Sequence, residues 1–126
     1  MIKVGTDIIE VERIKRAICH TPRFLNRVYS KREQEYLKSK KAGGFYNSAA
    51  ARFAAKEAFL KAFELGLFEV PLNEISVENK PNGAPKIVLA GSAAKAAEGY
   101  EISVSLSHTN SCATATVIAA QLKNQG

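Results

Sequence analysis

Four charged side chains interrupt an apolar segment, RFAAKEAFLKA, that runs from residue 52 to residue 62. They are Arg52, Lys56, Glu57 and Lys61. At about 100° of rotation per residue, apolar side chains cover most of the remaining circumference, which is typical of a helix in the middle of a domain. Burying an unpaired charge is costly, so these side chains need partners elsewhere in the chain.

Two interpretations of these charges are open. Glu57 and Lys61 are four residues apart in the favoured order, so they could form a surface ion pair that contributes roughly 0.3–0.5 kcal/mol. Alternatively, the carboxylate and the cations could line a polar cleft that binds a metal ion and an anionic ligand. The choice depends on what the rest of the chain brings to this helix.

Two further residues have no obvious packing role. Asp7 stands near the end of the apolar segment 2–9, where it could form a helix-capping pair with Glu10 instead of a binding site. His108 shares its strand face with Ile102, Val104 and Leu106, so its ring is expected to point toward the core and the long helix. A lone histidine on an apolar face is more often a core residue than a catalytic one.

The residue types favour a hard cation and a phosphate group. Mg²⁺ binds one or two protein carboxylates and completes its coordination with water and substrate phosphate oxygens, a pattern that Asp7 and Glu57 fit. Arg52, Lys56 and Lys61 could then hold the remaining phosphate charge. The sequence contains no P-loop, no GxGxxG motif and no GxSxG elbow, so neither a Gly-rich nucleotide cradle nor an internal nucleophile is expected.

The elements that must position these residues can be predicted from periodicity and caps. We expect a short buried strand over 2–9, then a helix through Ile18 and a short helix after Thr21. A capping box at Ser30 and Glu33 is expected to open a third helix. A long helix is expected from 47 or 48 to 65, with Gly66 as its terminator. A loop is expected between 38 and 44.

The second half of the chain has the two-residue alternation of strands. A hairpin is expected over 75–79 and 86–90 around the Asn-Gly turn, then an Ala-rich helix over 91–98, and strands over 101–107 and 113–120. The fold class is therefore predicted as α+β, with an antiparallel sheet packed on one long central helix and short helices near the N-terminus.

Composition limits the class of protein. The chain has 126 residues, 46% of them hydrophobic, which suits one domain spanning 1–126. No apolar run approaches the roughly 20 residues of a membrane span, and no secretory signal pattern is seen, so a cytoplasmic protein is expected. Cys19 and Cys112 lack metal-site or disulfide spacing and are expected to be reduced thiols.

The net charge of +6 is concentrated near the N-terminus. Residues 1–41 carry eleven Lys or Arg against five Asp or Glu, whereas residues 42–126 carry seven of each. Such a patch could bind nucleic acid, an anionic membrane or an acidic protein, or could simply be a solvated face. Charge alone does not separate these possibilities.

Four segments, taken in order, resemble the holo-[acyl-carrier-protein] synthase group of 4′-phosphopantetheinyl transferases. They are GTDIIE at 5–10, RFAAKEAFLKA at 52–62, NGAP at 82–85 and SLSHT at 105–109. The resemblance spans nearly the whole chain and implies a Mg²⁺-dependent enzyme. Such an enzyme moves the phosphopantetheine arm of coenzyme A onto a serine of apo-acyl carrier protein, as in fatty acid biosynthesis, and releases adenosine 3′,5′-bisphosphate.

The resemblance also implies site residues and a homotrimer with active sites between subunits. Asp7 and Glu57 would bind the metal. From the residues themselves we expect Lys61 or Lys56 to stabilise the departing phosphate. The general base would be Glu57 or a metal-bound water that Glu57 orients, with His108 as the alternative. Coenzyme A would contact the following residues: Arg52, Lys56, Lys61, Asn82, Gly83, Pro85, His108 and Thr109.

The acidic carrier protein would dock on the basic N-terminal third, and the residues expected to form the docking face are Arg13, Arg16, Arg23 and Arg27. The alternatives are a small basic nucleic-acid-binding module without catalysis, which lacks any recognisable stacking or helix-turn-helix motif, and a purely structural trimer.

Overall fold

The computed structural model describes residues 1–41 and 44–123. Its elements in chain order are β1 (Ile2–Glu10), α1 (Val11–His20), α2 (Phe24–Val28), α3 (Lys31–Lys38), α4 (Gly44–Ala62), the 3-10 turn η1 (Leu72–Glu74), β2 (Ile75–Asn79), β3 (Pro85–Leu89), α5 (Gly91–Ala96), β4 (Tyr100–His108) and β5 (Cys112–Gln121). The predicted α+β class is confirmed. No helix in the described part of the chain is long and apolar enough to cross a membrane.

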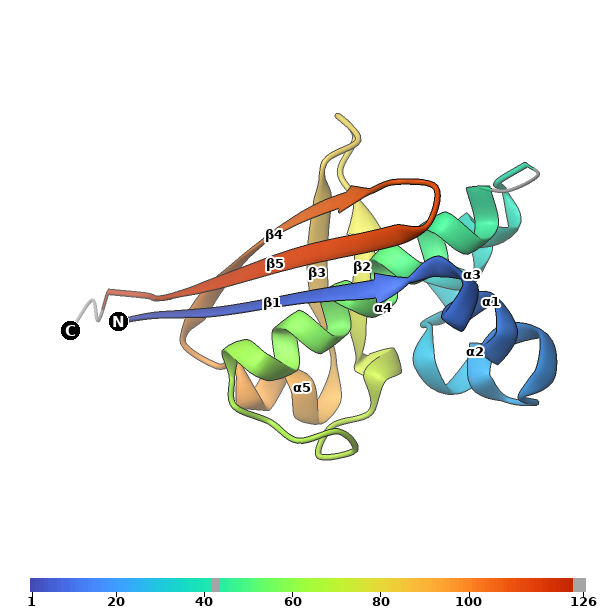
Figure 1. The fold of residues 1–126 in the computed structure, drawn as a ribbon. Coiled ribbons are helices and arrows are strands. Elements are labelled where there is room, and N and C mark those ends of the chain that lie inside the picture. Colours follow the sequence, from blue (N-terminus) through green and yellow to red (C-terminus); the bar gives the residue numbers. More distant parts are fainter. Residues whose placement is uncertain (42–43, 124–126) are drawn as a thin grey trace.

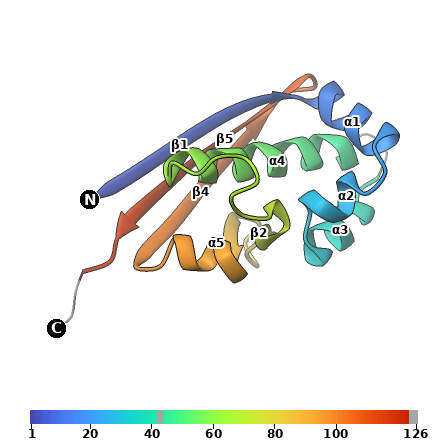
Figure 2. The same ribbon diagram turned by 90° about the horizontal axis from the view of Figure 1, so that it is seen from below.

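The long helix α4 is the centre of the fold (Figure 1). The strands form two antiparallel sheets rather than one: a three-stranded sheet in the order β1-β5-β4 and the separate hairpin β2-β3. Helices α1, α2 and α3 gather at the N-terminal end of α4, and α5 lies near its other end (Figure 2). Alternate residues of β5 are buried on the side of the sheet that faces α4, namely Ala113, Ala115, Val117 and Ala119.

The strand β1 is buried on one face only, which corrects the expectation of a wholly buried strand. Gly5 and Ile9 are buried, whereas Ile2, Val4 and Ile8 are each more than half exposed in a row along the outer face. Residues directly opposite each other in an antiparallel pair share a face, and Val4 pairs with Ile118, which is also exposed. The outer face of the three-stranded sheet therefore presents apolar side chains to solvent.

Gly5 is the point where β1 crosses α4. A Cβ atom at this residue would lie 1.9 Å from the carbonyl oxygen of Ala58 and 2.7 Å from the backbone nitrogen of Ala62. Only glycine allows the two backbones to approach so closely. Because Asp7 follows two residues later on the same strand face, this contact brings its carboxylate to the side of α4.

Gly5→Ala should lower the free energy of unfolding by about 1–3 kcal/mol, because the added methyl group must push two backbone segments apart. Chemical denaturation measures the change. Gly44→Ala is a suitable control, since its Cβ would meet only the Lys40 side chain at 3.5 Å, and it should be neutral or mildly stabilising. Equal stability of Gly5→Ala and the wild type would contradict the close contact.

The N-terminal cap predicted for α3 is confirmed, and the one predicted for α1 is not. The capping box is present, with the Glu33 amide donating to Ser30 Oγ at 3.1 Å and the Ser30 amide donating to Glu33 Oε1 at 2.9 Å. The expected cap by Asp7 and Glu10 is wrong: Asp7 lies within β1, and the N-cap residue Glu10 makes no side-chain capping bond.

The long helix begins at Gly44, earlier than predicted, and it ends before Gly66. Its last turn closes at Glu64, whose φ of 54° is left-handed, and Leu65 N donates to Leu60 O at 2.8 Å. A left-handed residue followed by this hydrogen bond is a usual way for a helix to end. The left-handed residue is normally a glycine, and here it is a glutamate. The loop predicted over 38–44 includes residues 42 and 43, which lie outside the described residues.

Candidate active site

The carboxylate of Asp7 meets the ammonium group of Lys61, although the two residues are 54 positions apart in the chain. Lys61 Nζ lies 3.2 Å from Asp7 Oδ1 and donates to the carbonyl oxygen of Thr6 at 3.0 Å. The Asp7 side chain is 15% exposed and that of Lys61 is 57% exposed. The strand β1 and the C-terminal half of α4 therefore form one charged wall that stays open to solvent.

Glu57 belongs to the same electrostatic environment. Burial raises the pKa of the Glu57 carboxyl above its ordinary value, the nearby charge of Asp7 raises it further, and Arg13 and Lys61 partly oppose the rise. None of the ion pairs within residues 1–41 and 44–123 includes Glu57. The surface pair between Glu57 and Lys61 is thus not the arrangement found, because Lys61 reaches across to Asp7 instead.

Asp7, Glu57 and Lys61, together with Arg13 on α1, are called the charged wall below. Its two carboxylates repel each other, which a divalent cation would relieve. In the described part of the chain, no cluster of three or more His, Cys, Asp or Glu residues could hold a metal ion. Two hard oxygen donors that leave most of the coordination to water and substrate phosphate match Mg²⁺ better than zinc or calcium.

Lys56 corrects one of the expected roles. It is fully buried, its ammonium lies 2.7 Å from Glu33 Oε1, and it also donates to the carbonyl oxygens of Leu72 at 3.0 Å and of Ile75. Burial lowers the pKa of Lys56 to about 8, against the opposing effect of Glu33. All three hydrogens are used inside the protein, so this lysine is not placed to contact a coenzyme A phosphate.

Arg52 lies one turn before Lys56 and is also buried, with 4% of its surface exposed. Its guanidinium stacks over the Tyr36 ring at 4.3 Å and approaches Asn79 Oδ1 at 3.5 Å. Within the described residues its Nε atom has no hydrogen-bond partner, and the side chain lines a cavity of about 420 Å³ between α3 and β2. An unsatisfied buried donor beside a cavity is what an anion-binding arginine would present.

The hairpin and the β4-β5 turn carry the other expected ligand residues. The hairpin turn is confirmed: Gly83 has a φ of 89° and donates to Lys80 O at 2.8 Å, and Asn82 Oδ1 accepts from the Ala84 amide. Pro85 begins β3, opposite Asn79, which Arg52 approaches. Arg52 therefore connects α4 with the turn end of this hairpin.

His108 ends β4 opposite the buried Ala113, so it lies on the face of the sheet toward α4 as expected, but at the end of the strand its side chain is exposed rather than covered by the core. Thr109 follows in the turn, where its Oγ1 accepts from the Cys112 amide at 3.1 Å. Across the described residues, no hydrogen bond or ion pair joins His108 or the hairpin turn to Asp7, Glu57 or Lys61. The structure thus assembles the charged wall but leaves the outer ligand residues apart from it.

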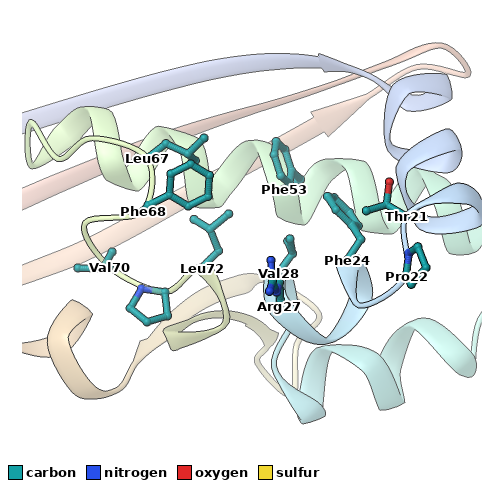
Figure 3. Close-up of a pocket in the computed structure, with 11 residues that line it drawn as sticks. Thr21, Pro22, Phe24, Arg27, Val28, Phe53, Leu67, Phe68, Val70 and Leu72 are labelled. Atoms are coloured by element: carbon teal, nitrogen blue, oxygen red, sulfur yellow. The ribbon is translucent and has the colours of Figure 1, made fainter.

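An apolar pocket of about 510 Å³, which was not predicted, lies between α2 and the segment 67–72 (Figure 3). Phe24, Arg27 and Val28 line it from α2, and Phe53 lines it from α4. The rings of Phe24 and Phe53 stack with centroids 6.1 Å apart. Because these residues are far apart in the chain, the only signal for the pocket in the sequence is the apolar face of α2.

The chain matches known proteins along nearly all of its length. The model of the 4′-phosphopantetheinyl transferase superfamily matches residues 3–117. The holo-[acyl-carrier-protein] synthase of Ruminiclostridium cellulolyticum is 46% identical over 123 residues, covering 91% of this chain and 89% of the relative. That of Treponema denticola is 40% identical over 121 residues, covering 94% and 97%.

The solved structures that resemble this chain are also holo-[acyl-carrier-protein] synthases. The holo-(acyl-carrier-protein) synthase of Bacillus anthracis in complex with CoA (3′,5′-ADP) is 30% identical with a TM-score of 0.81, and the alignment covers 96% of each chain. The Helicobacter pylori holo-[acyl-carrier-protein] synthase in complex with coenzyme A is 30% identical with a TM-score of 0.79, covering 93% of this chain and 99% of that one. These matches do not favour the alternative of a nucleic-acid-binding module.

Proposed function

The chain belongs to the 4′-phosphopantetheinyl transferase superfamily, and we propose that its charged wall transfers the phosphopantetheine arm of coenzyme A to a serine of apo-acyl carrier protein. The observation that carries the proposal is the convergence of Asp7, Glu57 and Lys61 from β1 and α4. The partner protein supplies the nucleophile, which agrees with the absence of a nucleophile motif in the sequence. The reaction would serve fatty acid biosynthesis.

Asp7 and Glu57 would hold Mg²⁺, with water and a pyrophosphate oxygen of coenzyme A as further ligands. When bound, the ion would neutralise the negative charge of the pyrophosphate and make its β-phosphorus easier to attack. The nearby charge of Asp7 supports this assignment, because together with burial it raises the pKa of Glu57 and so disfavours the charged form of Glu57 in the absence of a cation.

The protein's own groups would perform the remaining steps. Lys61 lies at the exposed edge of the charged wall, where its ammonium can stabilise the departing phosphate. Glu57 is our first choice for the general base, because its raised pKa brings it closer to neutral pH, where a base is most effective. His108 is the alternative base, although no described contact joins it to the charged wall.

Coenzyme A would extend from the charged wall toward the hairpin. Arg52 would bind a phosphate through its unsatisfied Nε, as its position beside the cavity supports. The hairpin residues Asn82, Gly83 and Pro85 would lie near the adenine, and His108 and Thr109 would contact phosphates. The direct chemical test is chromatography of the products: adenosine 3′,5′-bisphosphate should appear only when coenzyme A and apo-carrier protein are both present, and its absence would sink the proposal.

The bare outer face of the three-stranded sheet supports a homotrimer. Ile2, Val4, Ile8 and Ile118 form an exposed apolar row there, and such rows on a small protein commonly mark contacts with another chain. Burial of this face against other copies would place the active sites between subunits. This arrangement would also bring residues of a second copy to the charged wall and could complete the ligand set around His108.

The docking face for carrier protein would combine charge with apolar contact. Arg13, Arg16 and Arg23 are exposed on and around α1 and α2, and Arg27 lines the apolar pocket beside Phe24. Protein interfaces usually have an apolar centre with a polar rim, and basic residues would steer an acidic partner toward it. The free thiols of Cys19 and Cys112 fit the reducing cytoplasm, which we propose as the location.

Arg27→Glu should raise the KM for carrier protein by about tenfold or more, while the KM for coenzyme A changes little, because the reversed charge repels only the acidic protein. The effect should shrink as salt is added. Lys95→Glu makes the same change in net charge on α5, at the far end of α4, and serves as the control (Figure 1). Equal effects of the two variants on the carrier-protein KM would count against this docking face.

A further inference from the structure

A second charged pair lies inside the protein, away from the charged wall. Glu33 on α3 and Lys56 on α4 are 1% and 0% exposed as whole residues, and their charged atoms are 2.7 Å apart. Neither side chain reaches the surface where substrate would bind. The proposed mechanism does not use them, although Lys56 immediately precedes Glu57 on the same helix.

The pair connects α4 to three other elements. Glu33 Oε1 accepts from the Ser30 amide and Oε2 accepts from the Val77 amide of β2, each at 2.9 Å. Lys56 donates to the carbonyl oxygens of Leu72 in η1 and Ile75 in β2. The side chains are therefore fully hydrogen-bonded and join α3, α4, η1 and β2 at one point.

This connection fixes the rotation of α4 about its own axis. Side chains one residue apart differ by about 100° around a helix, so holding Lys56 inside the protein directs Glu57 toward β1. Gly5 meets Ala58 and Ala62, which brings β1 against that face of α4, and the buried pair adds directed hydrogen bonds on another side of the same helix. Reactive groups need to be held within about 0.5 Å and 10–20° of their working geometry.

Stability alone does not explain the pair. Removing two charges from water is expensive, and apolar residues of similar size often serve as well or better in a core. Charged groups with directed hydrogen bonds contribute a single defined geometry, because a hydrogen bond forms well in only a narrow range of distances and angles.

We propose that Glu33 and Lys56 are positioning residues for phosphopantetheine transfer, which hold α4 so that Glu57 and Lys61 face Asp7. The inference rests on the proposed function of the charged wall. Neither residue touches the reacting atoms. Their loss should therefore weaken the use of Mg²⁺ and lower kcat, and should do so even in protein that is fully folded.

The test compares Lys56→Met and Glu33→Gln with Leu37→Ala, a buried apolar residue of α3 that serves as a destabilised control. Each is assayed at a temperature where circular dichroism shows complete folding. Lys56→Met should lower kcat about 10–100-fold and raise the Mg²⁺ concentration needed for half-maximal rate, with a much smaller change in the KM for coenzyme A. Glu33→Gln should shift both quantities in the same direction by less.

Leu37→Ala should lose thermal stability yet keep the wild-type kcat and Mg²⁺ dependence. Positioning is overturned if both polar variants keep wild-type values, or if Leu37→Ala shows the same losses, because the effect would then follow stability alone. If Lys56→Met does not fold, Glu33→Gln decides the matter by the same criteria. The wild-type protein in the same assay distinguishes failure of the proposed function from failure of the positioning role. If the wild type shows no turnover, the proposed function fails. If the wild type is active and the variants are unaffected, only the positioning role is rejected.

Discussion

Glu57→Gln should lower the turnover of phosphopantetheine transfer by roughly 10²–10³-fold, the usual cost of removing one electrostatic group from an active site. Glutamine keeps the shape of the side chain but loses the charge that would bind Mg²⁺ and accept a proton. Steady-state kinetics at saturating coenzyme A and carrier protein measure the change. Glu64→Gln is the matched control, since Glu64 is exposed just beyond the end of α4 and should be silent.

The same substitution should not destabilise the metal-free protein. The raised pKa of Glu57 means that folding disfavours its charged form at neutral pH, chiefly through burial and then through Asp7. A neutral side chain removes this cost, so the Tm of metal-free Glu57→Gln should equal or exceed that of the wild type. Turnover at the wild-type rate would remove Glu57 from the site, and a large fall in Tm would show that the lost activity reflects unfolding.

Lys56→Met should cost about 3–5 kcal/mol of folding stability, because it leaves the buried Glu33 carboxylate without its counter-charge. Two backbone carbonyl oxygens also lose their donor. Methionine fills much of the same volume, so the loss would report the charge and the hydrogen bonds rather than a cavity. Urea denaturation, with the midpoint and slope both fitted, measures this change.

The matched comparison is the pair of the exposed Arg32 and the half-buried Glu78, whose closest atoms lie 3.8 Å apart. Arg32 is 79% exposed, so Arg32→Ala should change stability by no more than about 1 kcal/mol. A Lys56→Met effect as small as that of Arg32→Ala would contradict the expected penalty for leaving Glu33 unpaired. A loss of several kcal/mol for both variants would instead show that surface pairing matters more in this protein than expected.

The parts of the fold that could be predicted were those that local chemistry decides. The Ser30 and Glu33 capping box and the hairpin turn at Gly83 depend on residues a few positions apart, and both are present. The long helix was misjudged at both ends. Gly66 suggested its end, but the left-handed residue is Glu64, in a conformation that glycine usually adopts.

The charged wall was predictable for a different reason. Charges within an apolar helix need partners, and this requirement favoured Asp7 as one of them. The same reasoning could not separate Lys56 from Lys61, because both are cations on one helix. Only the fold shows that Lys56 pairs with Glu33, 23 residues away, inside the protein, whereas Lys61 pairs with Asp7 at the surface. The apolar pocket lined by Phe53 was hidden for the same reason.

The most direct test of the charged wall is the intact mass of apo-acyl carrier protein after incubation with this protein, coenzyme A and Mg²⁺. We expect the carrier to gain the mass of one phosphopantetheine group. The gain should disappear when Mg²⁺ is chelated, or when Asp7→Asn replaces the wild type. A carrier of unchanged mass, with a known transferase active in a parallel reaction, would contradict the proposed activity; an undiminished gain with Asp7→Asn would contradict the site.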